Sequence, residues 1–413
     1  MAHNRCSDRI RRDNGPSSRA KLISIRRRGS VVVTLGYRRK RRALGNLRYR
    51  FEQVDQSSPV RNARANTLRS RLGYATGEWR GLSLLLEFEN NTHVGQDRFN
   101  DGSDPVTDRA VIIDPDPTEI NQAVLRITAS KRTEIIAGRH RVVLDNERFF
   151  GDADFRQNQQ TFDGVTLVNL ALPRTELRYD HLSGAQGPLG SDSRRGSFNT
   201  DVGIFHATYR AQSGLAASAY GYFIDVDDDA SLSSRTIGAR VSGEHRAHKD
   251  LRVIYAAEIA RQSDFGNNSA SFSLDYYRVE PGLRAGDASV SIGLEVLEGN
   301  GTNAVQTPFA TLQRFQGFAD VFTTTPTNGI EDRFLAFSYK KPRIAGLDSV
   351  RVWGAYHEFE AAQSNSRYGS EIDAAIALSF LRHYRLTAKY AAYDSERFAT
   401  NIERIWLILE IRL

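Results

Sequence analysis

The sequence predicts an all-β protein: a transmembrane, antiparallel, up-and-down β-barrel of 18 strands. Three observations lead to this prediction. Apolar and charged residues alternate with a period of two from Leu44 to the C-terminus. The alternating segments are typically about 10–13 residues long, which is nearer to the roughly 9–11 residues of a tilted membrane-spanning strand than to the roughly 5–6 of a globular sheet. Short and long connections also alternate along the chain, as they do in outer-membrane barrels.

The composition excludes several other classes of protein. The 413 residues have a mean hydropathy of −0.46, and nowhere do they approach the roughly 18 uninterrupted apolar residues of a membrane-spanning helix. A single Cys excludes a disulfide framework and any Cys-based zinc or iron–sulfur site. The 21 Phe and 16 Tyr residues favour a β-rich chain.

The positive net charge belongs to the N-terminal segment and not to the body of the chain. Residues 1–50 contain 16 of the 56 Lys and Arg residues but only Asp8 and Asp13 among the 49 acidic residues, which leaves the rest of the chain with a net charge of −7. We expect residues 1–42 to be disordered or to come from a spurious start, because they contain too few apolar residues to offset the entropy of ordering. They show no secretion signal, since the apolar run Val31–Leu35 is too short. Residues 43–413 are the predicted barrel, and nucleic acid is not an expected partner.

Each predicted strand places an apolar row against a charged row. Clear examples are Leu47, Tyr49 and Phe51 against Arg48, Arg50 and Glu52; Leu68, Leu72 and Tyr74 against Arg69 and Arg71; Leu82, Leu84, Leu86 and Phe88 against Glu87 and Glu89; Leu125 and Ile127 against Arg126; and Ile136, Val142 and Leu144 against Arg139, Arg141 and Asp145. In chain order, the 18 predicted strands are residues 44–55, 65–76, 80–91, 120–129, 133–145, 163–171, 174–183, 198–211, 214–226, 234–245, 249–261, 270–278, 287–297, 332–341, 349–359, 370–380, 383–394 and 402–413.

The last of these strands supplies a separate indication. Its apolar row is Ile405, Leu407, Leu409, Ile411 and Leu413, and Arg404, Glu410 and Arg412 lie on the opposite face. Outer-membrane barrels commonly end on such a strand, which the assembly machinery binds. We therefore expect that machinery and outer-membrane lipid to be partners, although Leu413 replaces the usual final aromatic residue.

Several motifs resemble those of the alginate export family of outer-membrane porins. They are residues 47–52, 65–74 and 114–123, and the most specific runs from Ala137 to Asp163. His140 stands where this family has Gln, and its strand parity predicts that it points outward. The resemblance spans residues 44–413 and implies an 18-stranded passive channel for a polyuronate such as alginate.

The charged row of the early strands predicts the lining of a water-filled lumen. It contains Arg48, Arg50, Arg69, Arg71, Arg126, Arg139 and Arg141, opposed by Glu52, Glu87, Glu89 and Asp145. A barrel of this size is too wide for side chains to fill, and guanidinium groups bind carboxylates through paired hydrogen bonds. We therefore predict a path that favours anions. The alternative is that these Arg and Glu residues pair across neighbouring strands and only brace the wall.

Two long loops carry further polar residues. The loop at residues 146–162 contains Arg148, Arg156, Asn158, Gln159 and Gln160. It either folds inward as a constriction that contacts the solute or lies on the surface. The loop at residues 92–119 contains Asp101, Asp104, Asp108, Asp114 and Asp116, but their spacing matches no calcium-binding loop. We predict no metal site and no cofactor.

The function predicted from the sequence is passive, anion-favouring diffusion of a polyuronate or a related anionic saccharide across the bacterial outer membrane. One alternative is a general diffusion porin for small solutes, and another is a soluble β-rich carbohydrate-binding protein. The nine His residues are scattered, with no nucleophile elbow, metal-binding His pair or phosphate-binding glycine loop around them. We therefore expect no enzymatic activity.

Overall fold

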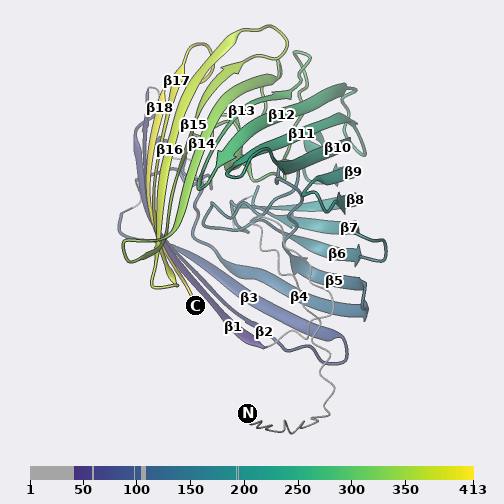
Figure 1. Cartoon of the computed structure of the whole chain (residues 1–413). Coiled ribbons are helices and arrows are strands. Elements are labelled where there is room, and N and C mark those ends of the chain that lie inside the picture. The colour runs from purple at the N-terminus through teal and green to yellow at the C-terminus, as the bar shows by residue number, and fades with distance from the viewer. Residues whose placement is uncertain (1–40, 58–59, 97, 104–107, 192, 194) are drawn as a thin grey trace, which may run out of the picture.

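A computed structural model describes residues 41–57, 60–96, 98–103, 108–191, 193 and 195–413. Eighteen antiparallel strands form one closed sheet (Figure 1), as the alternation predicts. The strands are β1 (Arg42–Gln56), β2 (Ala63–Ala75), β3 (Leu82–His93), β4 (Thr118–Ser130), β5 (Thr133–His140), β6 (Thr161–Asn169), β7 (Thr175–Gln186), β8 (Ser197–Arg210), β9 (Ala216–Val226), β10 (Ser234–Arg246), β11 (Leu251–Asp264), β12 (Ser273–Ala285), β13 (Ala288–Leu297), β14 (Ile330–Ile344), β15 (Leu347–Glu360), β16 (Arg367–Phe380), β17 (Tyr384–Ser395) and β18 (Ile402–Arg412).

Each strand pairs with its neighbour in sequence, and the barrel closes where the first strand meets the last. The closing register runs from Asn46 opposite Arg412 to Gln56 opposite Ile402. Two short 3-10 helices, Ala230–Leu232 and Leu312–Arg314, are the only helices in the part of the chain that the structure describes. Neither has the length or apolar character to cross a bilayer. The prediction for the N-terminal segment falls almost entirely on residues 1–40, which lie outside the described residues.

The two faces of the wall differ as the period of two requires. The outward face carries a belt of exposed apolar side chains, with Leu72, Ile259 and Ile292 at 62%, 62% and 59% exposure. Their neighbours in sequence point inward and are largely buried. Because an apolar belt of this kind needs contact with lipid, the soluble alternative does not fit the structure.

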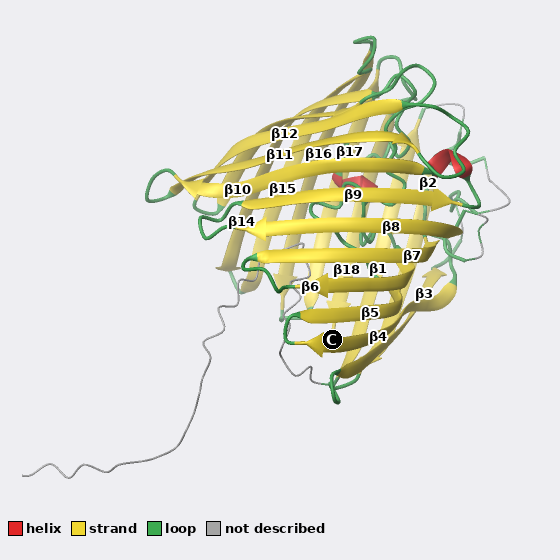
Figure 2. Cartoon of the chain, turned by 90° about the vertical axis from the view of Figure 1, so that its right-hand side faces the viewer, coloured by secondary structure: helices red, strands yellow, loops and turns green. Residues whose placement is uncertain are grey.

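The connections have two lengths and lie at the two ends of the barrel (Figure 2). The short-turn end carries tight turns such as those between β4 and β5, β12 and β13, and β14 and β15. The long-loop end carries the connections at residues 94–117, 141–160, 187–196 and 298–329. In barrels of this type the short turns face the periplasm and the long loops face outside.

The interior is more filled than the sequence predicts. Apolar side chains form a cluster inside the ring of strands, in which Phe149 and Phe150 pack against Tyr222 and Phe150 also contacts Phe162 and Phe309. Two of the long loops supply much of this material. The expectation of an open, wet lumen is therefore correct only for the cavities that these loops leave.

One predicted strand is too long because its chain turns inward. The predicted strand at residues 133–145 ends at His140, and the following residues enter the lumen as a loop. Ile136, Val142 and Leu144 are buried at 5%, 0% and 6% exposure, so they do not form the predicted lipid-facing row. Val142 and Leu144 are part of this inward loop, and Ile136 lies on the inner face of the wall, where it lines a cavity beside the loop.

Candidate functional site

Two long loops fold into the barrel and join each other there. We call residues 141–160 the first inward loop and residues 298–329 the second inward loop. Backbone hydrogen bonds connect them, from Gly151 N to Phe309 O at 2.9 Å and from Thr311 N to Glu147 O at 3.1 Å. Thr311 Oγ1 also donates to Glu147 Oε2 at 2.6 Å. The two loops thus form one bridge across the lumen, and the inward alternative for residues 146–162 is the one that the structure adopts.

Four Arg residues of the predicted lumen row attach the first inward loop to the wall. Arg48 Nη1 donates to the carbonyl oxygen of Asp154 at 2.7 Å, and Arg50 Nη1 donates to that of Phe155 at 2.9 Å. Further ion pairs and hydrogen bonds join Arg50 to Asp114, Arg71 to Glu89, and Arg69 to Glu410. These four Arg residues point inward, as predicted, but they are at most 7% exposed. They brace a loop, and they line none of the cavities described below.

Asp154 lies at the tip of this braced region. Its Oδ1 lies 3.5–4.0 Å from guanidinium nitrogens of Arg48, Arg69 and Arg71, and its side chain is 46% exposed to the lumen. Burial alone would raise the pKa of Asp154, but the three guanidinium groups outweigh this and hold the pKa well below its usual range. Asp154 is therefore ionised at neutral pH and offsets part of the positive charge of the cluster.

The two Arg residues predicted in the loop itself also have carboxylate partners. Arg148 Nε lies 3.1 Å from Glu295 Oε1 in β13, and its guanidinium packs over the ring of Phe315 at 4.6 Å. Arg156 Nη2 lies 2.5 Å from Asp320 Oδ2 of the second inward loop. Both Arg side chains are buried, and the pairs lock the two loops to the wall and to each other. Sequence reasoning had no means of finding these partners, which lie more than 140 residues away.

Arg139 and His140 lie on the faces opposite to those predicted. Arg139 pairs with Asp163 at 2.8 Å and donates to the carbonyl oxygen of Ile120, on the outer side of the wall. His140 is 2% exposed, and its Nε2 lies 2.8 Å from Thr166 Oγ1 in the lumen. The predicted parity was wrong because it assumed that the row of Ile136 faces lipid.

A basic cavity of about 590 Å³ lies at the short-turn end, on the first inward loop. Six Arg residues line it, against the acidic residues Glu87, Asp145 and Glu176: Arg42, Arg126, Arg141, Arg178, Arg210 and Arg240. Among the Arg residues of this cavity that form ion pairs, Arg210 and Arg141 have the most exposed side chains, at 50% and 39%. Asp145 accepts from His206 and Ser218, each at 2.8 Å. Of the predicted site residues, Glu87, Arg126, Arg141 and Asp145 meet here, whereas Glu89 is buried with Arg71.

Sequence reasoning missed four of the six Arg residues of this basic cavity, including Arg42 at the start of β1. Arg178, Arg210 and Arg240 come from β7, β8 and β10, where the same alternation places them on the inner face. The signal was available, because Arg178 lies between the outward residues Leu177 and Tyr179. The predicted lumen row stopped at the fifth segment and did not follow the alternation further.

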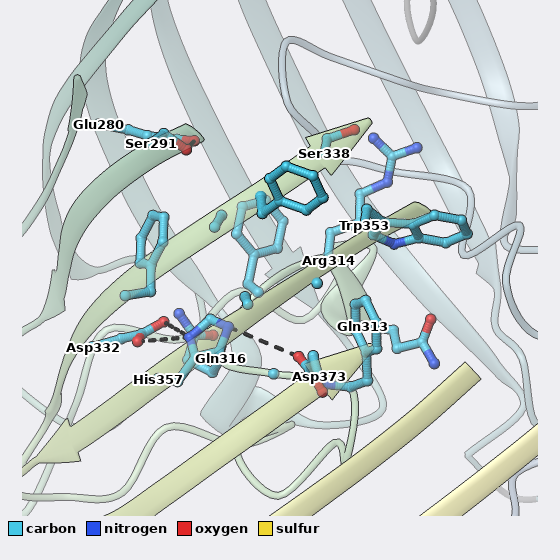
Figure 3. Close-up of a pocket in the computed structure, with 18 of the residues that line it drawn as sticks. Glu280, Ser291, Gln313, Arg314, Gln316, Asp332, Ser338, Trp353, His357 and Asp373 are labelled. Atoms are coloured by element: carbon cyan, nitrogen blue, oxygen red, sulfur yellow. Dashed lines mark hydrogen bonds and ion pairs between the residues drawn. The ribbon is translucent and has the colours of Figure 1, made fainter. Parts of the chain in front are cut away.

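Two more cavities lie on opposite sides of the second inward loop. The outer cavity, of about 580 Å³, lies at the long-loop end and is lined by both inward loops, including Phe155, Phe309 and Thr311. The inner cavity, of about 310 Å³, lies between residues 313–318 and the wall of β12–β16. There His357 Nδ1 lies 2.9 Å from Asp332 Oδ1, with Asp373 on its other side (Figure 3). Gln313 lines both cavities.

The acidic loop at residues 94–117 uses its carboxylates within the protein. Asp114 is buried and pairs with Arg50, and Asp108 pairs with Arg61 at 3.2 Å. Asp101 accepts hydrogen bonds from Ser103, while Asp104 lies outside the described residues. Within the described ranges, no group of three His, Cys, Asp or Glu side chains is placed to hold a metal ion.

Comparison with solved structures identifies the fold. OccK9 (OpdG) of Pseudomonas aeruginosa superposes with a TM-score of 0.72 at 16% identity, over 90% of this chain and 98% of that chain. OccAB4 of Acinetobacter baumannii gives 0.70 at 11% identity, over 91% and 98%. The structure of Pseudomonas aeruginosa OpdK with vanillate gives 0.69 at 14% identity, over 90% and 98%. The fold is that of the outer-membrane porins. No protein-family model matches the chain, and a search of curated proteins gives no match.

The porin fold agrees with the predicted fold class and with the predicted place in the bacterial outer membrane. Among these similar structures, OpdK carries the description of an outer membrane protein. The similarity is to porins of the Occ and Opd groups and does not reach the finer prediction of an alginate export porin.

Proposed function

We propose that this chain is a passive, non-catalytic channel of the bacterial outer membrane for small solutes, and that it favours anions. The basic cavity carries this proposal, because six Arg residues and three acidic residues line it. Five of these Arg residues pair with carboxylates, such as Arg141 with Asp152 at 2.5 Å. Among the residues that line the cavity itself, guanidinium groups still outnumber carboxylates six to three, and low-dielectric walls focus the field of this surface charge on a passing ion.

Small carboxylates are the solute class that we favour. The outer, inner and basic cavities have volumes of about 580, 310 and 590 Å³, which suits molecules with the size of a sugar acid or an aromatic acid. A solved structure of OpdK, which shares this fold, contains vanillate, a small aromatic carboxylate. Guanidinium forks at the cavity surface bind such groups through paired hydrogen bonds.

Passage of a polyuronate is the finer prediction, and the arrangement of the loops favours the general alternative over it. A polymer must thread past the bridge of two loops, which buried ion pairs such as Arg156–Asp320 hold together. A small solute needs only to pass beside that bridge. The polyuronate prediction therefore depends on a rearrangement that the small-solute proposal does not require.

We further propose that β18 is the segment that the outer-membrane assembly machinery binds. Ile405, Leu407 and Leu409 form its exposed outward row, and the strand closes the barrel against β1. Deleting residues 402–413 should abolish assembly, measured as the fraction of protein that shows heat-modifiable migration on gels. Assembly of the truncated chain at the normal yield would contradict this role.

Swelling of liposomes that contain the refolded chain tests the proposal on solute size and charge. We expect rapid swelling in isosmotic solutions of small carboxylates, slower swelling in a neutral amide of the same size, and none in long uronate oligomers. Equal rates for the carboxylate and its amide would contradict the preference for anions. Fast entry of the long oligomers would instead favour the polyuronate prediction.

A further inference from the structure

Four hairpins at the short-turn end place an Arg residue, at or beside the turn, in a backbone conformation that seldom holds one. Arg80, Arg174, Arg343 and Arg382 have φ angles of 50°, 60°, 50° and 63°. Gly, Asn and Asp are the usual residues at positive φ in a turn, because other side chains are strained there. The turns themselves therefore do not account for Arg at these positions, and strain of this kind often marks a functional position.

The guanidinium groups of these four turn Arg residues are available to a partner outside the chain. All four residues are exposed, and among the described residues none of them forms an ion pair with a carboxylate. Three acidic residues lie within five positions of them in the sequence, namely Glu78, Glu176 and Asp348. Glu176 pairs with Arg210 at 3.4 Å, and Asp348 accepts from the backbone N–H of Arg382 at 2.6 Å.

Each turn Arg residue also has an exposed apolar side chain within two positions of it. These side chains are Trp79 at 66% exposure, Leu172 at 54%, Ile344 at 38% and Leu381 at 72%. Phe380 and Tyr384, which flank the turn of Leu381, stack their rings at 5.5 Å. Apolar surface of this extent is unfavourable in water. A cationic head next to apolar and aromatic side chains is typical of the interface between lipid and water.

The turn after β4 and the turn after β6 adjoin and bring three cationic side chains together. Arg132 Nη1 donates to the carbonyl oxygen of Ala171 at 3.2 Å. Lys131 and Arg132 therefore lie next to the turn that contains Leu172 and Arg174, and all four of these residues are exposed. Neither turn contains an acidic residue. This part of the surface thus combines several cationic donors with one apolar side chain.

We propose that the short-turn end of the barrel binds anionic phospholipid. The turn Arg residues bind the lipid phosphate groups, and the apolar side chains beside them enter the region of the acyl chains. Guanidinium groups suit this role because they bind phosphate through paired hydrogen bonds, and basic residues at a membrane surface attract anionic lipid. Since the short turns of such barrels face the periplasm, the lipid belongs to the periplasmic leaflet. The inference concerns the lipid around the channel and is independent of the solute that passes through it.

An anionic protein or polymer of the periplasm is the competing partner for these charges. Such a partner would use the same guanidinium groups but would not require an exposed apolar side chain beside each of them. The apolar neighbours favour lipid, because only lipid offers both a phosphate and an acyl chain at the edge of the apolar belt. Substituting the charged and the apolar side chains separately distinguishes the two partners.

Native mass spectrometry of the full chain in a neutral detergent measures the apparent Kd for phosphatidylglycerol and for phosphatidylcholine, whose choline group offsets the phosphate charge. The turn variant replaces all four turn Arg residues with Gln. We expect its Kd for phosphatidylglycerol to rise about tenfold, equivalent to about 1.4 kcal/mol, and its Kd for phosphatidylcholine to change less than about twofold. The matched control, which should bind both lipids like the wild type, replaces four exposed Arg residues of the long-loop end with Gln: Arg64, Arg98, Arg235 and Arg367.

A second variant removes apolar surface and keeps every charge. In the double substitution Leu172→Ser and Leu381→Ser, we expect the Kd for phosphatidylglycerol to rise about threefold. An unchanged Kd in this variant, together with weaker binding in the turn variant, would indicate a soluble anionic partner and overturn the lipid site. Heat-modifiable migration verifies that each variant is folded. If the turn variant does not fold, the Ser variant and the comparison of the two lipids still decide the question.

Other outcomes would also contradict the lipid site. Equal Kd values for the two lipids in the wild-type chain would overturn it, as would equal losses of affinity in the turn variant and the long-loop control. Either result, in a chain that conducts normally, would leave the proposed channel function intact. A chain that binds phosphatidylglycerol as expected but forms no conducting channel would contradict only the proposed function.

Discussion

Arg156 of the first inward loop and Asp320 of the second form an ion pair across the lumen, with Arg156 Nη2 2.5 Å from Asp320 Oδ2. Their side chains are 11% and 4% exposed. The pair joins segments that lie 164 residues apart in the sequence. It adds an ion pair to the hydrogen bonds that join the two loops into one bridge.

Removing the carboxylate of this pair should loosen the bridge. In Asp320→Asn the guanidinium of Arg156 stays buried without its partner, which typically costs about 3–5 kcal/mol. We expect a lower midpoint temperature for heat-modifiable migration and larger conductance fluctuations. Asp275→Asn is the matched control, because Asp275 pairs with the exposed Arg261 on the outer face and such pairs contribute roughly 0–1 kcal/mol. Equal effects of the two substitutions would contradict a locked bridge.

The low pKa of Asp154 predicts how the first inward loop responds to acid. A carboxyl group whose pKa falls on folding stabilises the protein fully above its ordinary value of 3.8 and loses this contribution as the pH falls through the lower folded-state value. The difference in midpoint temperature between wild type and Asp154→Asn should therefore stay constant from pH 7 to pH 4 and shrink only below that. A difference that already shrinks near pH 5 would show that the three neighbouring Arg residues do not hold this pKa down.

Arg139 on the outer face of the wall and Arg141 in the first inward loop should affect ion selectivity differently. Arg141 lines the basic cavity, whereas Arg139 pairs with Asp163 on the outer face. Arg141→Ala should lower the permeability ratio of anion to cation about twofold, as expected for a screened charge worth roughly 0.5 kcal/mol. Arg139→Ala should leave the ratio unchanged. Reversal potentials in a salt gradient measure the permeability ratio of each variant. A larger change in Arg139→Ala than in Arg141→Ala would contradict an ion path along the basic cavity.

A charge placed on the lipid-facing belt should oppose membrane insertion. Leu84 is 55% exposed on the outer face, while its neighbour Leu85 lines the basic cavity. Leu84→Arg should lower the free energy of unfolding, by up to the roughly 2–4 kcal/mol that such a charge costs at the bilayer midplane, because the guanidinium must leave water. Leu85→Arg places the same group in a polar cavity and should cost much less. The folded fraction of each variant in liposomes at increasing urea measures the difference. Similar losses of folded protein in the two variants would contradict the placement of Leu84 toward lipid and Leu85 toward the lumen.

The barrel was predictable because lipid and lumen impose the period of two along each strand. Leu47, Tyr49 and Phe51 alternate with Arg48 and Arg50, and the structure gives these two rows the faces that the pattern predicts. The strand count follows from the same signal, since each segment must cross the bilayer before it can turn. Local sequence thus contains the information for the wall.

The interior was predictable only in part, because its contacts join residues far apart in the sequence. The loop at residues 146–162 is rich in hydrogen-bond donors, which allows an inward fold but does not reveal Asp320 or Glu295 as partners. Ile136 has the pattern of a lipid-facing residue, but it lies on the inner face of the wall and lines the basic cavity. The parity of Arg139 and His140 was wrong for this reason. Gln313, which lines both the outer and the inner cavity, shows no pattern that marks it in the sequence.

The reversal potential of single channels in a gradient of potassium chloride tests the central claim most directly, because it reports the sign of the charge that the open path favours. With the wild-type chain, the account predicts a potential that corresponds to higher permeability for chloride than for potassium, and a smaller potential in Arg141→Ala. Higher permeability for potassium in the wild-type chain would contradict an anion-favouring lumen.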